Sequence, residues 1–138
     1  MKHTDEQLGN SLKRDGLMLL NLPFPPSVNT YWRANGHRRF ISKAGVDFKQ
    51  AVAEYVIEHE IPKYGSQRLG LAITIYGPNK RKFDLDNRLK AVLDALQDAG
   101  VFDDDEQVDI LLVKRGEIVK NGLAVVIIGA IDNEEDHG

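Results

Sequence analysis

Acidic and basic side chains cluster in one stretch of the 138-residue sequence, Lys80 to Gln107. A basic run at 80–82 precedes two carboxylates, Asp84 and Asp86, and a second acidic cluster at 103–105 follows a helical pattern. Clustered carboxylates suit a hard divalent cation such as Mg²⁺, and Lys and Arg suit phosphate. The stretch therefore indicates chemistry on a phosphodiester.

Carboxylates gathered at one point repel one another, so one of them would keep its proton unless a cation joined them. Mg²⁺ removes this conflict because it accepts carboxylate and phosphate oxygens together. It would also lower the pKa of a bound water and polarise the phosphorus. Lys90, one helical turn beyond Asp86, could stabilise negative charge on the phosphate or position the water.

Each of these residues also has a purely structural explanation. Asp84 or Asp86 could be a helix N-cap or a first-turn acid that complements the helix dipole. Lys90 could form an i, i+4 ladder with Asp86 and Asp94, which is worth ~0.3 kcal/mol per pair. The cluster at 103–105 could be a solvated turn.

Other kinds of metal site do not fit the sequence. An EF-hand is excluded because Arg88 and Leu89 stand where that loop needs an acid and a glycine. The four histidines lack paired ligand spacing, and there is no cysteine, so zinc and disulfides are not expected. The absence of cysteine fits a reducing compartment.

Composition and charge favour a cytoplasmic protein that could bind a polyanion. The polar N-terminus lacks the apolar segment of a signal peptide, and no apolar run reaches the roughly 18–20 residues of a membrane span. The net charge is −3, but four acids lie in the last seven residues, and 33–43 contains only basic charges. Local basic patches matter more than the net charge for such a partner.

The pattern of apolar residues predicts a mixed β-sheet with two main helices packed on one face, an α/β sandwich of the α+β kind. Helices are expected from Lys43 to about Glu58, after Ser42 as N-cap, and from Leu85 to Ala99, before Gly100. Strands are expected at 17–22, 40–41, 69–76, 108–115 and 123–131. Lys120, Asn121 and Gly122 indicate a hairpin between the last two strands. The expected organisation is a flexible arm at 1–15, a single domain at 16–131 and a disordered acidic tail at 132–138.

The second expected helix separates the two groups of carboxylates by roughly 22 Å. The strand that follows could run back beside the helix and return the cluster at 103–105 to Asp84 and Asp86. Alternatively, the other subunit of a dimer could supply the second cluster. The sequence leaves both arrangements open.

Residues 29–39 form an expected long loop that interleaves aromatic and basic side chains. Tyr31 and Trp32 accompany Arg33, Arg38 and Arg39, a combination that suits phosphate contacts and stacking on an unpaired base. Tyr31 and Trp32 could instead anchor the loop to the core. Phe83, next to Asp84, could likewise be a wedge at a DNA junction or a core residue.

Five motifs occur in order along the chain: L-P-F-P-P-S-V-N-T-Y-W-R at 22–33, S-K-A-G at 42–45, D-L-D-N-x-x-K at 84–90, D-A-L at 94–96 and D-D-x-Q at 104–107. Together they resemble the RusA family of Holliday junction resolvases over residues 17–131. The resemblance implies a homodimeric, Mg²⁺-dependent endonuclease, typically carried by phages and prophages, with Mn²⁺ as a substitute metal. It places the metal-binding aspartates on Asp84, Asp86 and Asp105 and the active-site lysine on Lys90. Phe83 departs from the family, which often has a basic residue there.

The resemblance implies resolution of four-way DNA by paired symmetric nicks during recombination and repair. A two-fold dimer would present two matched sites to such a junction. The residues expected to contact DNA are Tyr31, Arg33, Arg38, Arg39, Lys80, Arg81, Lys82 and Asn87. The alternative is a non-catalytic protein that binds branched nucleic acid and uses its aspartates as helix caps. A glycosyltransferase with a D-x-D site for Mn²⁺ is disfavoured because the chain is too short for a donor domain.

Overall fold

The computed structural model describes residues 16–27, 32–35 and 38–131, and for 32–35 and 38–40 it describes the backbone alone. The predicted arm at 1–15 and the predicted acidic tail at 132–138 lie outside the described residues. The elements are β1 (Leu17–Leu22), β2 (Trp32–Asn35), β3 (Arg38–Ile41), α3 (Lys43–Glu58), β4 (Leu69–Tyr76), α4 (Leu85–Asp98), the short 3₁₀ helix η1 (Asp105–Gln107), β5 (Val108–Arg115) and β6 (Leu123–Ala130).

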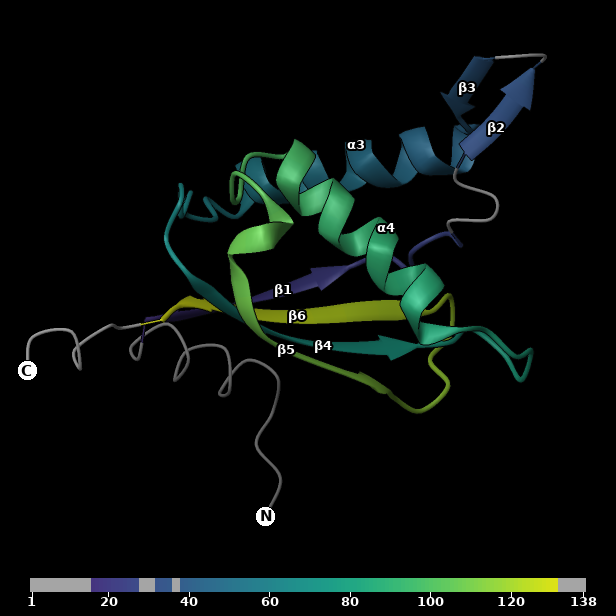
Figure 1. The fold of residues 1–138 in the computed structure, drawn as a ribbon. Helices are drawn as coiled ribbons and strands as arrows, with labels where there is room; N and C mark the ends of the chain where they lie inside the picture. Colours follow the sequence, from purple (N-terminus) through teal and green to yellow (C-terminus); the bar gives the residue numbers. More distant parts are fainter. Residues whose placement is uncertain (1–15, 28–31, 36–37, 132–138) are drawn as a thin grey trace, which may run out of the picture.

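The main sheet has four strands in the order β1-β6-β4-β5. β6 pairs antiparallel with both β1 and β4, whereas β4 and β5 run parallel. Both long helices cover the same face of this sheet (Figure 1). The predicted fold class, a mixed sheet with two helices on one face, is confirmed.

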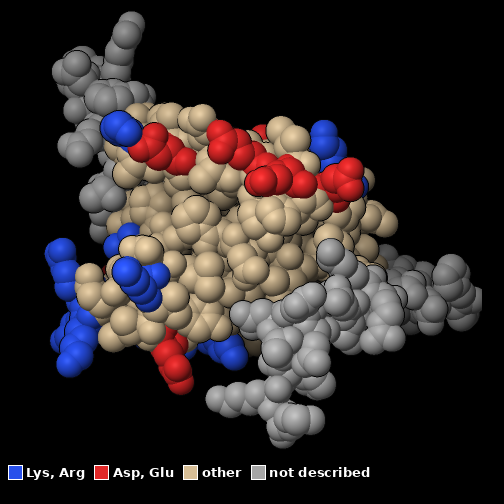
Figure 2. Space-filling model, turned by 180° about the vertical axis from the view of Figure 1, so that it is seen from behind, with Lys and Arg blue, Asp and Glu red and all other residues tan. Residues whose placement is uncertain are grey.

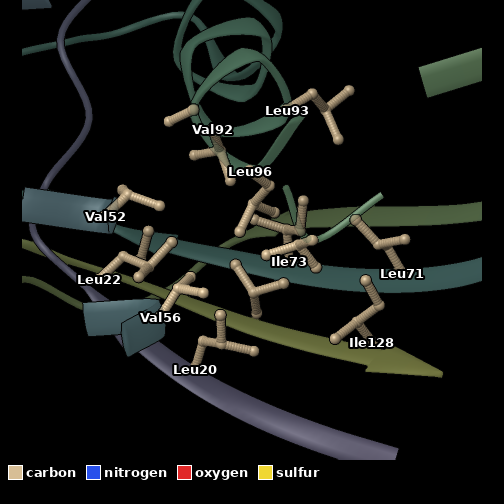
Figure 3. Close-up of a cluster of buried hydrophobic side chains, with 14 of the residues drawn as sticks. Leu20, Leu22, Val52, Val56, Leu71, Ile73, Val92, Leu93, Leu96 and Ile128 are labelled. Carbon is tan, nitrogen blue, oxygen red and sulfur yellow. The ribbon is translucent and has the colours of Figure 1, made fainter. Parts of the chain in front are cut away.

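The core forms where the apolar faces of the helices meet the apolar face of the sheet. In β4 the buried residues alternate with half-buried ones, as expected of a strand with one covered face. Each helix has its buried residues at helical spacing, which turns one apolar stripe toward the sheet. Figure 3 shows these side chains converging from both layers, among them Leu20, Leu22, Val52, Val56, Leu71, Ile73, Val92, Leu93, Leu96 and Ile128.

The predicted hairpin between the last two strands is wrong. β4 lies between β5 and β6, so these two strands do not pair. Asn121 and Gly122 do form a tight turn with positive φ values of 69° and 72°. Turn residues predict only the local backbone conformation, however. Here the chain after the turn enters β6, which lies on the opposite side of β4 from β5. The parallel β4–β5 pair requires a crossover, and α4 supplies it.

Residues 29–39 are not one long loop. β2 and β3 pair antiparallel and form a separate two-stranded sheet beyond the start of α3 (Figure 1). The short strand predicted at 40–41 is therefore the second half of β3. The strand β2 was not expected from the sequence. The remaining boundaries agree to within one residue, and the Ser42 hydroxyl caps α3 by accepting from the Gly45 N–H at 3.2 Å. No helix in the described part of the chain has the length and apolarity needed to cross a membrane.

Candidate functional site

Asp84 occupies the N-cap position of α4, between the loop that leaves β4 and the first turn of the helix. Its backbone is extended, but its side chain makes no capping hydrogen bond. It accepts instead from the side-chain amide of Asn87 at 3.3 Å. Asp86 follows in the first turn and is exposed. Two exposed carboxylates therefore lie at the start of α4, and the Asp84 side chain does not cap the helix.

Lys90 lies one turn further along α4 and is exposed. Its charge acts on Asp94, a half-buried carboxylate on the same helix. Burial raises the pKa of Asp94, Lys90 and Lys49 oppose that rise, and Asp105 and Asp98 add to it. Asp94 was not predicted as a site residue, although the helical spacing had placed it on the same face as Asp86 and Lys90.

Asp105 begins η1, after α4 has ended. Its charge reaches Asp94 in the C-terminal half of α4, whereas Asp84 and Asp86 lie at the N-terminal end. In the described segments no group of three or more His, Cys, Asp or Glu side chains is arranged to hold a metal ion. Within one chain, Asp84 and Asp86 therefore both lie at the start of α4, whereas Asp105 lies near Asp94 in the C-terminal half of that helix.

The segment that carries Asp105 is fixed by a buried glutamine. Gln107 is 3% exposed, and its side-chain oxygen accepts from the backbone N–H groups of Asp103 and Asp104 at 3.1 and 2.9 Å. Its amide nitrogen donates to the carbonyls of Gly65 and Gln67 at 2.8 and 2.6 Å. Gln107 therefore joins the acidic segment to the loop before β4.

Arg68 holds the same segment from outside. Its guanidinium donates to the Glu106 carbonyl at 2.9 Å and to both carboxylate oxygens of Asp109, through Nε at 3.0 and 3.1 Å and also through Nη2. Asp104 caps η1 by accepting from the Glu106 N–H at 3.1 Å. Asp104 thus has a structural role, and its neighbour Asp105 is left as the candidate ligand.

The basic run at 80–82 forms an exposed loop next to Asp84. The Asn79 side chain accepts from the backbone N–H of Arg81 at 2.9 Å and shapes the turn. Lys80, Arg81 and Lys82 line a cavity of about 500 Å³ that also reaches Asp84 and Arg115. Figure 2 shows Lys and Arg gathered at this end of the molecule, apart from a row of acidic side chains along the helix layer.

Phe83 is half-buried and links the Pro-rich segment after β1 to the start of α4. Its ring meets Phe24 edge-on, with centroids 5.3 Å apart. Arg88 lies over the Phe24 ring at 4.7 Å and donates to the Pro25 carbonyl at 2.7 Å. Burial lowers the pKa of Arg88. This packing fixes the Pro-rich segment against the helix that carries the acids.

Arg115, at the end of β5, also contacts Phe83. Its guanidinium carbon is 4.3 Å from the centre of the Phe83 ring, and its Nη2 donates to the Phe83 carbonyl at 3.0 Å. Arg115 was not among the site residues expected from the sequence. Nothing in the sequence links positions 83 and 115, because their contact depends on the parallel pairing of β4 and β5.

The model of the family "Endodeoxyribonuclease RusA" matches residues 23–128. The chain belongs to the RusA family.

Relatives in the RusA family match most of this chain. The crossover junction endodeoxyribonuclease of Enterobacteria phage HK97 is 40% identical over 101 residues, which is 73% of this chain and 84% of the relative. The protein of that name from Escherichia coli K12 is 34% identical over 116 residues, 83% of this chain and 96% of the relative. That of Enterobacteria phage 82 is 34% identical over 115 residues, with the same coverage of both chains.

The RusA-family match extends over the segments predicted to contact DNA, but their contacts stay predictions. Tyr31 lies outside the described residues. Arg33 belongs to β2 and Arg38 and Arg39 to β3, where the backbone alone is described. Asn87 bonds Asp84 in the structure, and its predicted contact with DNA is untested.

Proposed function

We propose that the protein is an endodeoxyribonuclease that resolves Holliday junctions by paired symmetric nicks during DNA recombination and repair. The observation that carries this proposal is that the Asp84 carboxylate makes no capping hydrogen bond, although Asp84 is the N-cap of α4. This carboxylate lies beside Asp86 and a basic cavity. We infer the reaction and the substrate from its relatives, which are named crossover junction endodeoxyribonucleases.

The donor set suits Mg²⁺, with Mn²⁺ as a substitute, because these cations prefer carboxylate oxygen. Asp84 and Asp86 would hold the ion, and the Asn87 amide orients Asp84. The bound ion would supply an activated water and neutralise charge on the phosphate. Lys90 then stabilises charge that develops on the phosphate, and the lysines and arginine at 80–82 hold neighbouring phosphates.

Asp105 completes this site from a second copy of the chain. β5 lies at the edge of the sheet, and among the described strands it pairs with β4 alone. It exposes Ile110, Leu111 and Leu112 to the extent of 61, 43 and 60%. Such an apolar edge favours pairing with another strand. The proposed dimer therefore joins two chains side by side along β5.

The positions where β5 begins and ends support this proposed pairing. The strand begins directly after η1, which carries Asp105, and it ends at Arg115, which contacts Phe83 beside Asp84. A two-fold axis at the middle of β5 sets the start of one strand beside the end of the other. Asp105 of the partner subunit then lies toward Asp84 and Asp86, and the dimer carries two matched sites for two strands.

The experiment incubates a labelled synthetic four-way junction with the purified protein, with and without Mg²⁺, and maps the nicks. We expect symmetric nicks on two opposing strands with Mg²⁺ and none in its absence. A linear duplex of the same sequence is the control. Binding to the junction without nicks under any divalent metal would instead identify a branched-DNA-binding protein without catalysis.

A cytoplasmic location is part of the proposal.

A further inference from the structure

The cavity beside Asp84 has two fixed walls. One is the loop from Gly77 to Asp84, and the other is the segment from Arg115 to Ile118. Backbone hydrogen bonds join them, because the Gly116 N–H donates to the Ile75 carbonyl at 2.9 Å and the Val119 N–H donates to the Gly77 carbonyl at 3.0 Å. The cavity is therefore held open by the end of the sheet and does not depend on side-chain positions alone.

Gly116, directly after the end of β5, packs closely against Tyr76. A Cβ atom on Gly116 would lie 2.3 Å from the Tyr76 ring, which is closer than packed atoms can approach. The backbone at residue 116 therefore approaches the Tyr76 ring more closely than a residue with a side chain could without moving that ring. Arg115 and Ile118, on either side of Gly116 in the sequence, both line the cavity.

The lining combines flat and apolar surfaces with positive charge. The Arg115 guanidinium lies over Phe83 and is fixed by its bond to the Phe83 carbonyl. Ile118 is 54% exposed. Lys80, Arg81 and Lys82 supply three cations at the rim. A phosphate needs only the cations, whereas the planar guanidinium and the exposed isoleucine suit a flat, partly apolar group such as a nucleobase.

We propose that this cavity binds one unstacked nucleotide of the DNA, with its base against Arg115 and Ile118 and its phosphate at the lysines. The inference rests on the proposed function and adds a nucleotide site beside the cleaved bond. The volume of about 500 Å³ lies within the range of small-molecule sites, roughly 300–1,000 Å³. Bases at the branch point lack the continuous stacking of a duplex, so taking one of them out of its pair costs less there. The cavity would therefore favour a branch point over a duplex.

The test measures equilibrium binding without divalent metal to junctions in which one nucleotide at a time near the crossover is abasic. For the wild type we expect one position at which loss of the base weakens binding about tenfold. Arg115→Gln should bind the intact junction about tenfold more weakly and show no further loss at that position. Arg115→Lys keeps the charge without the planar group, so it should also lose the discrimination between intact and abasic DNA.

Lys114→Gln is the matched control. It removes the same charge one residue earlier in β5, where the side chain points to the opposite face of the sheet. It should keep the wild-type discrimination. Discrimination by Arg115→Gln equal to that of the wild type would overturn the proposal, and so would a wild type for which no abasic position matters. Both of those results would make Arg115 at most a phosphate contact.

A short single-stranded DNA scanned in the same way separates this inference from the proposed function. If the protein cuts the intact junction but ignores abasic positions, the nucleotide site is wrong and the nuclease assignment stands. If it cuts no junction but still discriminates against an abasic single strand through Arg115, the nucleotide site stands and the nuclease assignment is wrong.

Discussion

Asp84 and Asp104 both occupy the N-cap of a helical segment, yet they use their carboxylates differently. Asp104 accepts from the Glu106 N–H, and with Gln107 it forms a capping box. Asp84 makes no capping bond. Loss of an N-cap side chain lowers the free energy of unfolding by about 1 kcal/mol. Substitution of Asp104 should therefore affect stability, whereas substitution of Asp84 should affect catalysis.

We predict that Asp84→Asn, Asp86→Asn and Asp105→Asn each abolish cleavage and leave junction binding intact or tighter. Removing a charge loses the metal ion and also lessens the repulsion of phosphate. Nick formation and equilibrium binding are measured for each variant. Asp104→Asn is the control, because asparagine also caps a helix, and it should cut normally. Cleavage within severalfold of the wild type in all three variants would rule out the metal assignment.

Lys90→Ala should slow cleavage at saturating DNA about 100-fold or more and change affinity far less. Lys90 is proposed to act on charge that develops only in the transition state. Single-turnover rates and binding constants provide the comparison. Equal losses in rate and affinity would make Lys90 a contact to the ground-state phosphate.

Residues that belong to one helix could be related to one another from the sequence alone. Helical geometry placed Asp86, Lys90 and Asp94 on one face, and the structure shows that Lys90 and Asp94 interact. Arg115 could not be found in this way. Its contact with Phe83 joins two segments through the tertiary structure, and local spacing holds no information about that pairing.

At the scale of elements, η1 is a short segment whose position depends on Gln107. Two backbone donors and two backbone carbonyls bond to that one buried side chain. The motif D-D-x-Q therefore combines a cap, a candidate ligand and the amide that anchors both.

We predict that Gln107→Met lowers the free energy of unfolding by about 3 kcal/mol, because it leaves buried backbone groups without partners. Cleavage should fall as well, since the segment that carries Asp105 loses its anchor. Urea denaturation gives the stability, and Gln97→Met on the exposed face of α4 is the control. A Gln107→Met protein as stable and active as the control would show that η1 is held by other contacts.

The contact between Arg68 and Asp109 predicts a dependence on pH. The hydrogen bond from Arg68 lowers the pKa of Asp109 below its ordinary value of 3.8. A carboxyl with a lowered folded-state pKa stabilises the fold above its unfolded pKa, and this contribution is lost as the pH falls through the folded value. Asp109→Asn should therefore lower the urea midpoint at pH 7, and the difference from the wild type should vanish well below pH 3.8. A difference that is the same at both pH values would contradict the assignment.

At the scale of the whole molecule, the two separated acidic groups make a test of the dimer possible. In a dimer of one Asp84→Asn chain and one Asp105→Asn chain, one site would combine both substitutions and the other would combine none. We predict that this mixed dimer, purified through two tags, nicks a supercoiled plasmid with a cruciform and gives open circles, although neither variant alone cuts.

Asp84→Asn mixed with Asp86→Asn is the control for this complementation. Both substitutions affect the same end of α4, so each site would keep one damaged residue and no activity should return. If the Asp84→Asn and Asp105→Asn chains form dimers that stay inactive, each site draws all its carboxylates from one chain, and the pairing through β5 is wrong.

The sequence was sufficient to predict the two long helices, the four strands of the main sheet and the class of that sheet, but not β2 or the order of the strands. Apolar alternation identified 69–76 and 108–115 as strands because that pattern is local. Strand order depends on which distant segments pair. The turn at Asn121 and Gly122 suggested a neighbour relation between β5 and β6 that the α4 crossover prevents.

The position of β6 has a consequence for how the protein is made. β6 is the last of the described strands to leave the ribosome, yet it pairs with both β1 and β4 at the centre of the sheet. While 123–130 are still being synthesised, β1 has no partner and the four-stranded sheet cannot close. Contacts this distant in sequence also form slowly. A chain that stops before β6 is therefore expected not to form this sheet, so the start of α4 and the cavity beside it would not be assembled until 123–130 have been made.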